Sequence, residues 1–280
     1  MKRLKISAIS YLNTAPLMWD FEHGDSASAF DISYTLPSQC ARELAGETAD
    51  IGIIPAAAYA SIPSLKILPG VAIASKQPVR SILLVCKVPL ERVKTVALDK
   101  SSMTSVALVK ILFGKFWGGD RSFSEINPDL AEMLENHDAA LLIGDPALQV
   151  DRSCYETYDL AEEWIHLTGK PFVFAFWAIR RAAIKNIPDR FDLARVFASS
   201  RDHGLQPANV DFIVREWAMR LKLTEENVRR YLTENIHYYL DSACLDGLQL
   251  FYRYAQECGA LPTSPSLDFL DFPNSAVTAR

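Results

Sequence analysis

The sequence predicts a two-lobed α/β protein with a C-terminal helical stack. Strand-like and helix-like segments alternate over most of the 280 residues, which is typical of sheets covered by helices. Two long apolar strands, 79–88 and 172–180, bracket a central α/β segment and are predicted to mark two crossings between lobes. After about residue 188, apolar residues recur with the 3.6-residue period of helices.

The first 55 residues follow a β-α-β-α-β order. Strands rich in apolar and β-branched residues are predicted over 4–9, 30–36 and 51–54. Pro16 and Pro37 each suit the first turn of a helix, and Gly46 is a typical stop for the second one. This order predicts an open, mostly parallel sheet.

The remaining elements divide the chain into two lobes. Further strands are predicted over 79–88, 95–99, 139–144 and 172–180, with helices over 101–117, 129–136 and from 145 onward. Four helices fill the last third, over 189–204, 207–223, 224–240 and 241–259. We expect residues 1–83 and 178–280 to form lobe one and 84–177 to form lobe two, with a ligand cleft between them.

Composition and charge exclude several classes of protein. The net charge of −5 implies no basic face, so we expect neither nucleic acid nor an anionic membrane as a partner. Five widely spaced cysteines without a C-x-x-C, and five scattered histidines, predict reduced thiols and no metal site. Polar residues interrupt the apolar run near the start, so we expect no signal peptide and a cytoplasmic location. No oligomeric state is predicted.

Five polar loops follow predicted strand ends, where open α/β sheets bind ligands. The first, "ISYLNTAPL", offers the hydroxyl and amide groups of Ser10, Tyr11, Asn13 and Thr14. Either Asn13 or Thr14 caps the helix at Pro16, or the segment forms one lip of a binding site.

The second and third loops hold Ser38 and the pair Arg80 and Ser81. Ser38 either caps the helix that begins at Pro37 or leaves backbone N–H groups free for an anion. Arg80 is either a partner for a carboxylate or an exposed charge at a strand end. Ser81 lies beside a predicted crossing, where a cleft is expected.

The fourth loop, "DKSSMTS", gathers four hydroxyl residues before an apolar helix, namely Ser101, Ser102, Thr104 and Ser105. A helix cap needs only one of them, so the surplus predicts a loop wrapped on an anion, assisted by the helix dipole. The glycines and the G-K-[ST] ending of a P-loop are missing.

The fifth loop contains Gly144 and Asp145. Gly144 permits close backbone approach after a buried strand. Asp145 either caps a helix that has Pro146 at its first position or serves as a catalytic carboxylate.

Taken together, these loops resemble the chorismate dehydratases of the futalosine-dependent menaquinone pathway. The resemblance covers residues 4–255 and rests on six segments in a fixed order: "ISYLNTAPL", "LPSQCARELAGETADIGIIP", "ASKQPVRSILLV", "VALDKSSMTSVALVKIL", "ALLIGDPAL" and "EEWIHLTGKPFVFAFWAIR". The related 1,4-dihydroxy-6-naphthoate enzyme has a Cys-Pro-Asn-Asp run in its first loop. Tyr-Leu-Asn-Thr at that place favours the chorismate enzyme.

The resemblance implies a fold like the type II periplasmic binding proteins. It also implies removal of water from dianionic chorismate, giving 3-[(1-carboxyvinyl)oxy]benzoate, without a cofactor. Asn13 then orients the substrate or binds the leaving hydroxyl, and the hydroxyl-rich loops hold the carboxylates. The base is either Asp145, with a pKa raised by burial, or the enolpyruvyl carboxylate of the substrate. We favour the substrate carboxylate, because the loops are poor in acids.

Three alternatives share the implied fold. They are the sister menaquinone enzyme, a solute-binding protein for transport, and the ligand-sensing domain of a transcription regulator. A transport protein is expected to carry an export signal or lipid anchor, and a regulator a helix-turn-helix. Neither is predicted from this sequence.

Overall fold

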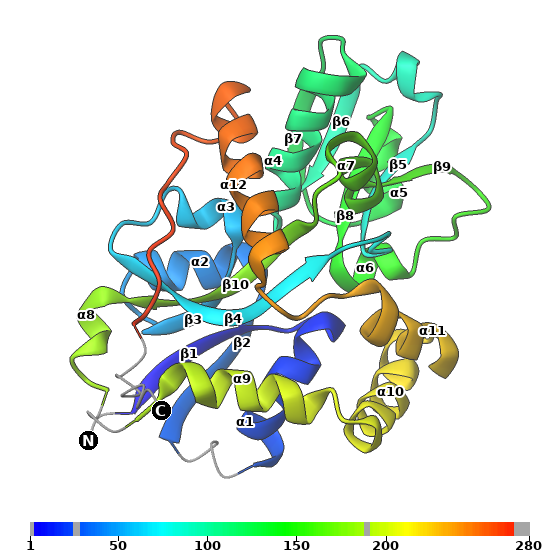
Figure 1. Cartoon of the computed structure of the whole chain (residues 1–280). Helices are drawn as coiled ribbons and strands as arrows, with labels where there is room; N and C mark the ends of the chain where they lie inside the picture. Colours follow the sequence, from blue (N-terminus) through cyan, green and yellow to red (C-terminus); the bar gives the residue numbers. More distant parts are fainter. Residues whose placement is uncertain (1–2, 25–28, 188–190, 272–280) are drawn as a thin grey trace.

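The chain forms two five-stranded sheets with helices packed around them (Figure 1). The structure is a computed structural model that describes residues 3–24, 29–187 and 191–271. The first sheet has the strand order β2 (Phe30–Thr35), β1 (Leu4–Ile9), β3 (Ile51–Pro55), β10 (Phe172–Arg180) and β4 (Leu65–Ser75). The second has the order β7 (Ser122–Ile126), β6 (Thr95–Asp99), β8 (Ala139–Ile143), β5 (Ile82–Cys86) and β9 (Glu156–Asp159).

Strand direction follows the same pattern in both sheets. β1 runs parallel to β2 and β3, and β6 runs parallel to β7 and β8. β10 and β5 are antiparallel to both of their neighbours. Each sheet is therefore mixed, whereas the alternation of strands and helices predicts a mostly parallel sheet. The chain passes directly from β4 of the first sheet to β5 of the second sheet, without the crossover helix that joins parallel neighbours.

Local sequence signals explain how the helices over these sheets begin and end. α2 (Pro37–Ala45) has proline in its first turn and buries Cys40, Ala41 and Leu44. α7 (Leu160–Thr168) is capped by Asp159, whose carboxylate accepts from two backbone N–H groups, and it ends at a left-handed Gly169. Shorter helical segments are η1 (Leu12–Met18), α1 (Trp19–His23), α3 (Ala56–Tyr59), η3 (Leu90–Arg92), η4 (Leu112–Trp117), α5 (Leu130–Glu135), α6 (Gly144–Leu148) and α8 (Arg181–Ile184).

The C-terminal helices touch both halves of the molecule (Figure 1). α9 (Leu193–Gly204) packs against η1 and β4, and α10 (Pro207–Leu221) packs against α11 (Glu225–Arg230). α12 (Ser242–Glu257) lies against β10 and also against α4 (Thr104–Ile111). The predicted α/β class with C-terminal helices is confirmed. Within the described ranges, no helix is long and apolar enough to cross a membrane.

Two predicted helices differ from those observed. The helix predicted from Pro16 begins earlier, because the 3-10 segment η1 starts directly after Tyr11. The helix predicted over 224–240 ends with the π-helical η5 (Tyr231–Asn235). Beyond it the chain is extended, and His237 exchanges two backbone hydrogen bonds with Ala74. Tertiary pairing with β4 therefore overrides the helical period of these residues.

Candidate active site

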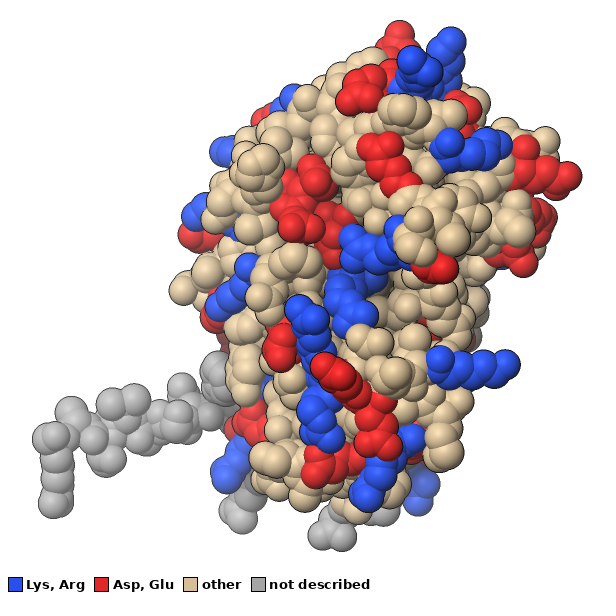
Figure 2. All heavy atoms as spheres, turned by 90° about the vertical axis from the view of Figure 1, so that its right-hand side faces the viewer, with Lys and Arg blue, Asp and Glu red and all other residues tan. Residues whose placement is uncertain are grey.

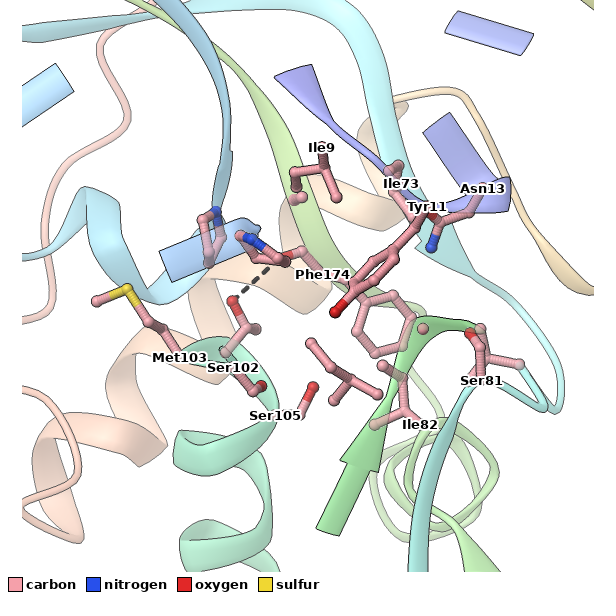
Figure 3. A pocket seen from close by; sticks show the side chains of 17 residues that line it. Ile9, Tyr11, Asn13, Ile73, Ser81, Ile82, Ser102, Met103, Ser105 and Phe174 are labelled. Carbon is pink, nitrogen blue, oxygen red and sulfur yellow. Dashed lines mark hydrogen bonds between the residues drawn. The ribbon is translucent and has the colours of Figure 1, made fainter. Parts of the chain in front are cut away.

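A cavity lies where the loops after several strands of both sheets meet. The space between its walls is about 500 Å³ when the solvent at its open side is included. Figure 3 shows the ring of Tyr11 between Asn13 and Ser81 on one side and Ser102, Met103 and Ser105 on the other. Of the predicted site residues, seven line this cavity: Tyr11, Asn13, Ser81, Ser102, Thr104, Ser105 and Gly144. The apolar lining includes Ile9, Ile73, Ile82, Ile143 and Phe174.

The absence of a side chain at Gly144 leaves room for the ring of Tyr11. Gly144 has a left-handed backbone, with φ at 62°, and a Cβ placed there would lie 2.6 Å from Cε2 of Tyr11. Only glycine tolerates both conditions. The Tyr11 hydroxyl lies 3.4 Å from Oγ of Ser101, and burial raises the pKa of the phenol to about 12. Tyr11 is therefore a neutral hydroxyl at physiological pH.

Two of the four hydroxyls of the fourth loop make hydrogen bonds that support the structure, and the other two remain available at the cavity. Ser101 donates from its backbone N–H and its hydroxyl to one carboxylate oxygen of buried Asp99, at 2.8 and 2.6 Å. Thr104 donates to the carbonyl of Phe174 at 2.9 Å and accepts from the N–H of Ala57 at 3.1 Å. Ser102 and Ser105 line the cavity, and their hydroxyls have no hydrogen-bond partner among the described residues.

No side chain caps the start of α4. The N-terminus of α4 is therefore open toward the cavity, and the side chains of Ser102 and Ser105 lie beside it. Backbone N–H groups and the positive end of the helix dipole favour an anion at this place.

Ser81 forms the opposite wall together with a residue that the sequence did not single out. The hydroxyl of Tyr231 in η5 donates to Oγ of Ser81 at 2.8 Å, and burial raises the pKa of Tyr231. Asn13 lies on the same side and accepts from the hydroxyl of Thr14 at 3.3 Å. The helical period around Tyr231 predicts only packing, because nothing local indicates that its tip reaches the loop at Ser81.

Asp145 lies beside the cavity but is absent from its lining. Its Oδ1 accepts from the backbone N–H of Leu12 at 3.0 Å. Burial raises its pKa to about 6, while the Leu12 N–H and the charge of Arg220 act in the opposite direction. Asp145 does not cap α6, which already begins at Gly144. The interpretation of Asp145 as the cap of its own helix is therefore wrong, and it instead holds the first turn of η1.

Three further predicted site residues lie outside this cavity. Ser10 lines a separate hollow, where its Oγ accepts from Arg220 at 3.4 Å. Ser38 uses its backbone N–H to donate to the carbonyl of Ser101 at 3.1 Å, while its neighbour Pro37 reaches the lining. Arg80 points into another hollow, beside Arg152 and Arg230.

The cavity wall carries no formal charge, since its described lining includes no Lys, Arg, His, Asp or Glu. The groups available to bind an anion inside it are hydroxyls, an amide, backbone N–H groups and the dipole of α4. Such preorganised neutral donors stabilise charge most where water is excluded.

One group of potential metal ligands occurs elsewhere in the described residues. His237, Asp241 and Cys244 can each offer a ligand atom within 4.8 Å of the others. Lys76 already donates to the Asp241 carboxylate at 2.6 Å, and His237 lies 2.9 Å from the same oxygen. These side chains do not line the cavity.

Comparison with known proteins identifies related sequences along nearly the whole chain. A family model described as menaquinone biosynthesis matches residues 4–257. A chorismate dehydratase from Thermus thermophilus is 29% identical over 273 residues, which cover 91% of this chain and 94% of that protein.

Solved structures show the same fold at low sequence identity. Protein AF1704 from Archaeoglobus fulgidus matches with a TM-score of 0.71 at 18% identity, covering 92% of this chain and 98% of that one. The periplasmic aliphatic sulphonate binding protein SsuA from Escherichia coli matches with a TM-score of 0.65 at 16% identity, covering 100% and 96%. The predicted likeness to periplasmic binding proteins is confirmed.

Proposed function

Because the chain belongs to the menaquinone biosynthesis family, we propose that it removes water from chorismate to give 3-[(1-carboxyvinyl)oxy]benzoate. The observation that carries this proposal is a cavity lined by neutral hydrogen-bond donors at the open start of α4. The relative from Thermus thermophilus, which is named a chorismate dehydratase, supports the same reaction.

The chemistry suits a catalyst without charged groups. The C3–H bond and the C4–O bond of chorismate break, and the proton and hydroxide leave together as water. The ring then becomes aromatic, which supplies a large driving force. The protein must hold two carboxylates and position the leaving hydroxyl.

We assign these tasks to the residues that line the cavity. Ser102, Ser105 and the backbone N–H groups at the start of α4 bind one carboxylate, and Ser81 binds the other. Asn13 hydrogen-bonds the leaving hydroxyl, while the neutral phenol of Tyr11 packs against the ring and donates from its O–H.

The enolpyruvyl carboxylate of the substrate is the base in this proposal. The described lining contains no histidine or carboxylate that could accept the C3 proton. Asp145, the carboxylate that the sequence offered as a base, is absent from the lining and already accepts from the N–H of Leu12. A base must come within hydrogen-bond reach of the proton it removes.

The lobe boundaries and the location in the cell are part of the same proposal. The lobes are residues 1–83 with 178–280, and residues 84–177. The boundaries fall inside β5 and β10, the two antiparallel strands that lie beside the crossings.

The five cysteines are all free, which fits a reducing cytoplasm.

A binding protein without catalysis is the alternative, since the sulphonate-binding protein from Escherichia coli shares this fold. Incubation of the purified protein with chorismate separates the two. The proposal requires loss of the diene absorbance and a product lighter by one water in mass spectrometry. Saturable chorismate binding without that product would instead establish the binding function.

A further inference from the structure

Three arginines line a further hollow, beside the segment that crosses between the sheets. We call it the arginine hollow and define it by Arg80, Arg152 and Arg230. Arg80 comes from the crossing segment 76–81, Arg152 from the segment between α6 and β9, and Arg230 from the end of α11. Figure 2 shows basic side chains gathered in a hollow near the middle of this face.

The positive charge of the hollow is only partly balanced. Arg230 pairs with Glu234 at 3.3 Å, but both side chains are mostly exposed. Arg80 donates to the carbonyl and the amide oxygen of Asn227 at 3.5 Å, and Arg152 donates to the hydroxyl of Thr157 at 3.1 Å. Neither of these two arginines has a carboxylate partner within 4.0 Å in the described part of the chain.

Glu162 also lines the hollow, so three guanidinium groups face two carboxylates. Burial and the neighbouring charges of Arg230 and Arg152 lower the pKa of Arg80. A dianion among the three arginines would relieve this mutual repulsion.

Arg80 is held in place by its backbone. Its φ of 65° lies in the left-handed region, which residues other than glycine rarely adopt. Its N–H donates to the carboxylate of Asp159, a buried side chain that also caps α7. This conformation turns the Arg80 side chain outward, while its neighbours Val79 and Ser81 line the active-site cavity.

We propose that the arginine hollow binds an oxyanion of the phosphate class, either the free ion or the phosphoryl group of a larger ligand. Planar guanidinium groups match the oxygens of such an anion with paired hydrogen bonds. The site is separate from the active-site cavity. The two share the crossing segment, because Arg80 precedes Ser81 and Arg230 precedes the Tyr231 that donates to Ser81.

Calorimetric titration of the full chain with inorganic phosphate at low ionic strength tests this proposal. We expect one site, with affinity reduced tenfold or more in Arg152→Gln, about the effect of losing a charged hydrogen bond. Arg80→Gly removes the guanidinium and keeps a residue that tolerates positive φ, so its loss of binding cannot be assigned to a distorted loop. Ribose 5-phosphate in a parallel titration distinguishes the sources, since tighter binding than phosphate indicates an esterified ligand.

Arg215→Gln is the matched control, because Arg215 is an exposed arginine on α10 outside the hollow. An equal loss of affinity in Arg215→Gln would reduce the effect to net charge and overturn the proposal. Unchanged affinity in both hollow variants, or no binding up to about 10 mM phosphate, would overturn it as well. So would loss of phosphate binding in Ser105→Ala, which would place the ion in the active-site cavity. None of these measurements uses chorismate, so they are independent of the proposed reaction.

Discussion

The carboxylate of Asp145 accepts a hydrogen bond from the backbone N–H of Leu12 at 3.0 Å. Leu12 follows β1 of the first sheet, and Asp145 follows β8 of the second. One partly buried hydrogen bond therefore joins the loops that follow these two strands, beside the cavity. It also occupies the carboxylate that would otherwise be the obvious choice for a general base.

The Asp145→Asn substitution tests whether the carboxylate takes the substrate proton. The new amide oxygen can still accept from Leu12, so the loop stays in place. We expect kcat for chorismate dehydration to stay within about tenfold of wild type, because the amide keeps the hydrogen bond to Leu12, although a neutral acceptor makes that bond about half as strong. A loss of about 10³ in kcat is the scale of a missing general base and would contradict catalysis by the substrate carboxylate.

The same variant has a predicted pH signature in stability. Burial raises the pKa of folded Asp145 to about 6, against about 3.9 in an unfolded chain. The folded protein thus binds this proton more tightly, and its free energy of unfolding falls as pH rises from about 4 to about 6. Asparagine does not titrate, so the variant gains stability relative to wild type across that window. Urea unfolding at a series of pH values measures the difference, and a constant difference would show that folding does not raise the pKa of Asp145.

Asn13→Ala is expected to lower kcat by about 10² and leave the unfolding midpoint nearly unchanged. Asn13 lines the cavity, its bond from the Thr14 hydroxyl is long at 3.3 Å, and loss of one positioned donor has an effect of this size. Asn136→Ala, at the exposed end of α5, is the matched control and is expected to retain full activity. Wild-type turnover in Asn13→Ala would remove this residue from the mechanism.

Gly144→Ala separates backbone strain from displacement of Tyr11. Gly169→Ala is its control, since Gly169 has a similar φ of 67° but no other group lies within 4 Å of the place its methyl group would take. We expect Gly169→Ala to lower the free energy of unfolding by about 1–2 kcal/mol with unchanged KM. Gly144→Ala is expected to lose about 3 kcal/mol and to raise KM severalfold, because its methyl group collides with the Tyr11 ring. Equal behaviour of the two variants would show that Gly144 does not position Tyr11.

Tyr231→Phe tests the residue of the cavity wall that the sequence did not reveal. Removing its hydroxyl frees Ser81 to rotate, so we expect kcat/KM to fall about tenfold and stability to fall about 1 kcal/mol. Tyr252→Phe removes another buried hydroxyl, which donates to the carbonyl of Ala56 at 2.7 Å. It is expected to lose similar stability and to keep kcat/KM. If both variants keep kcat/KM, the Tyr231 hydroxyl serves the fold alone.

Strand and helix signals in the sequence were sufficient for many elements but not for β4. The predicted strands 4–9, 95–99 and 172–180 agree with β1, β6 and β10. β4 contains Pro69 and Gly70, which usually end a strand. In the structure, Ile67 and Ala72 pair with Ala178 and Phe176, so the two breaking residues lie in an irregularity of the ladder. Only the partner strand, far away in the chain, makes this segment a strand.

The site was predictable where chemistry is local. Four hydroxyls in one loop exceed the needs of a helix cap, and the structure leaves Ser102 and Ser105 in the cavity wall. The direction of Arg80 was not predictable, because it depends on a positive φ that is held by the distant Asp159. Tyr231 reaches the site only through the packing of η5 against the crossing, which no sequence period encodes.

The position of β10 has a consequence for the order of synthesis. β10 lies between β3 and β4, so β4 has no neighbour in its sheet until residues 172–180 have been made. The ribosome adds about 100 further residues in that interval, and domains generally fold as units during synthesis. The first sheet can therefore gain β10 and β4 only after all five strands of the second sheet have been synthesised.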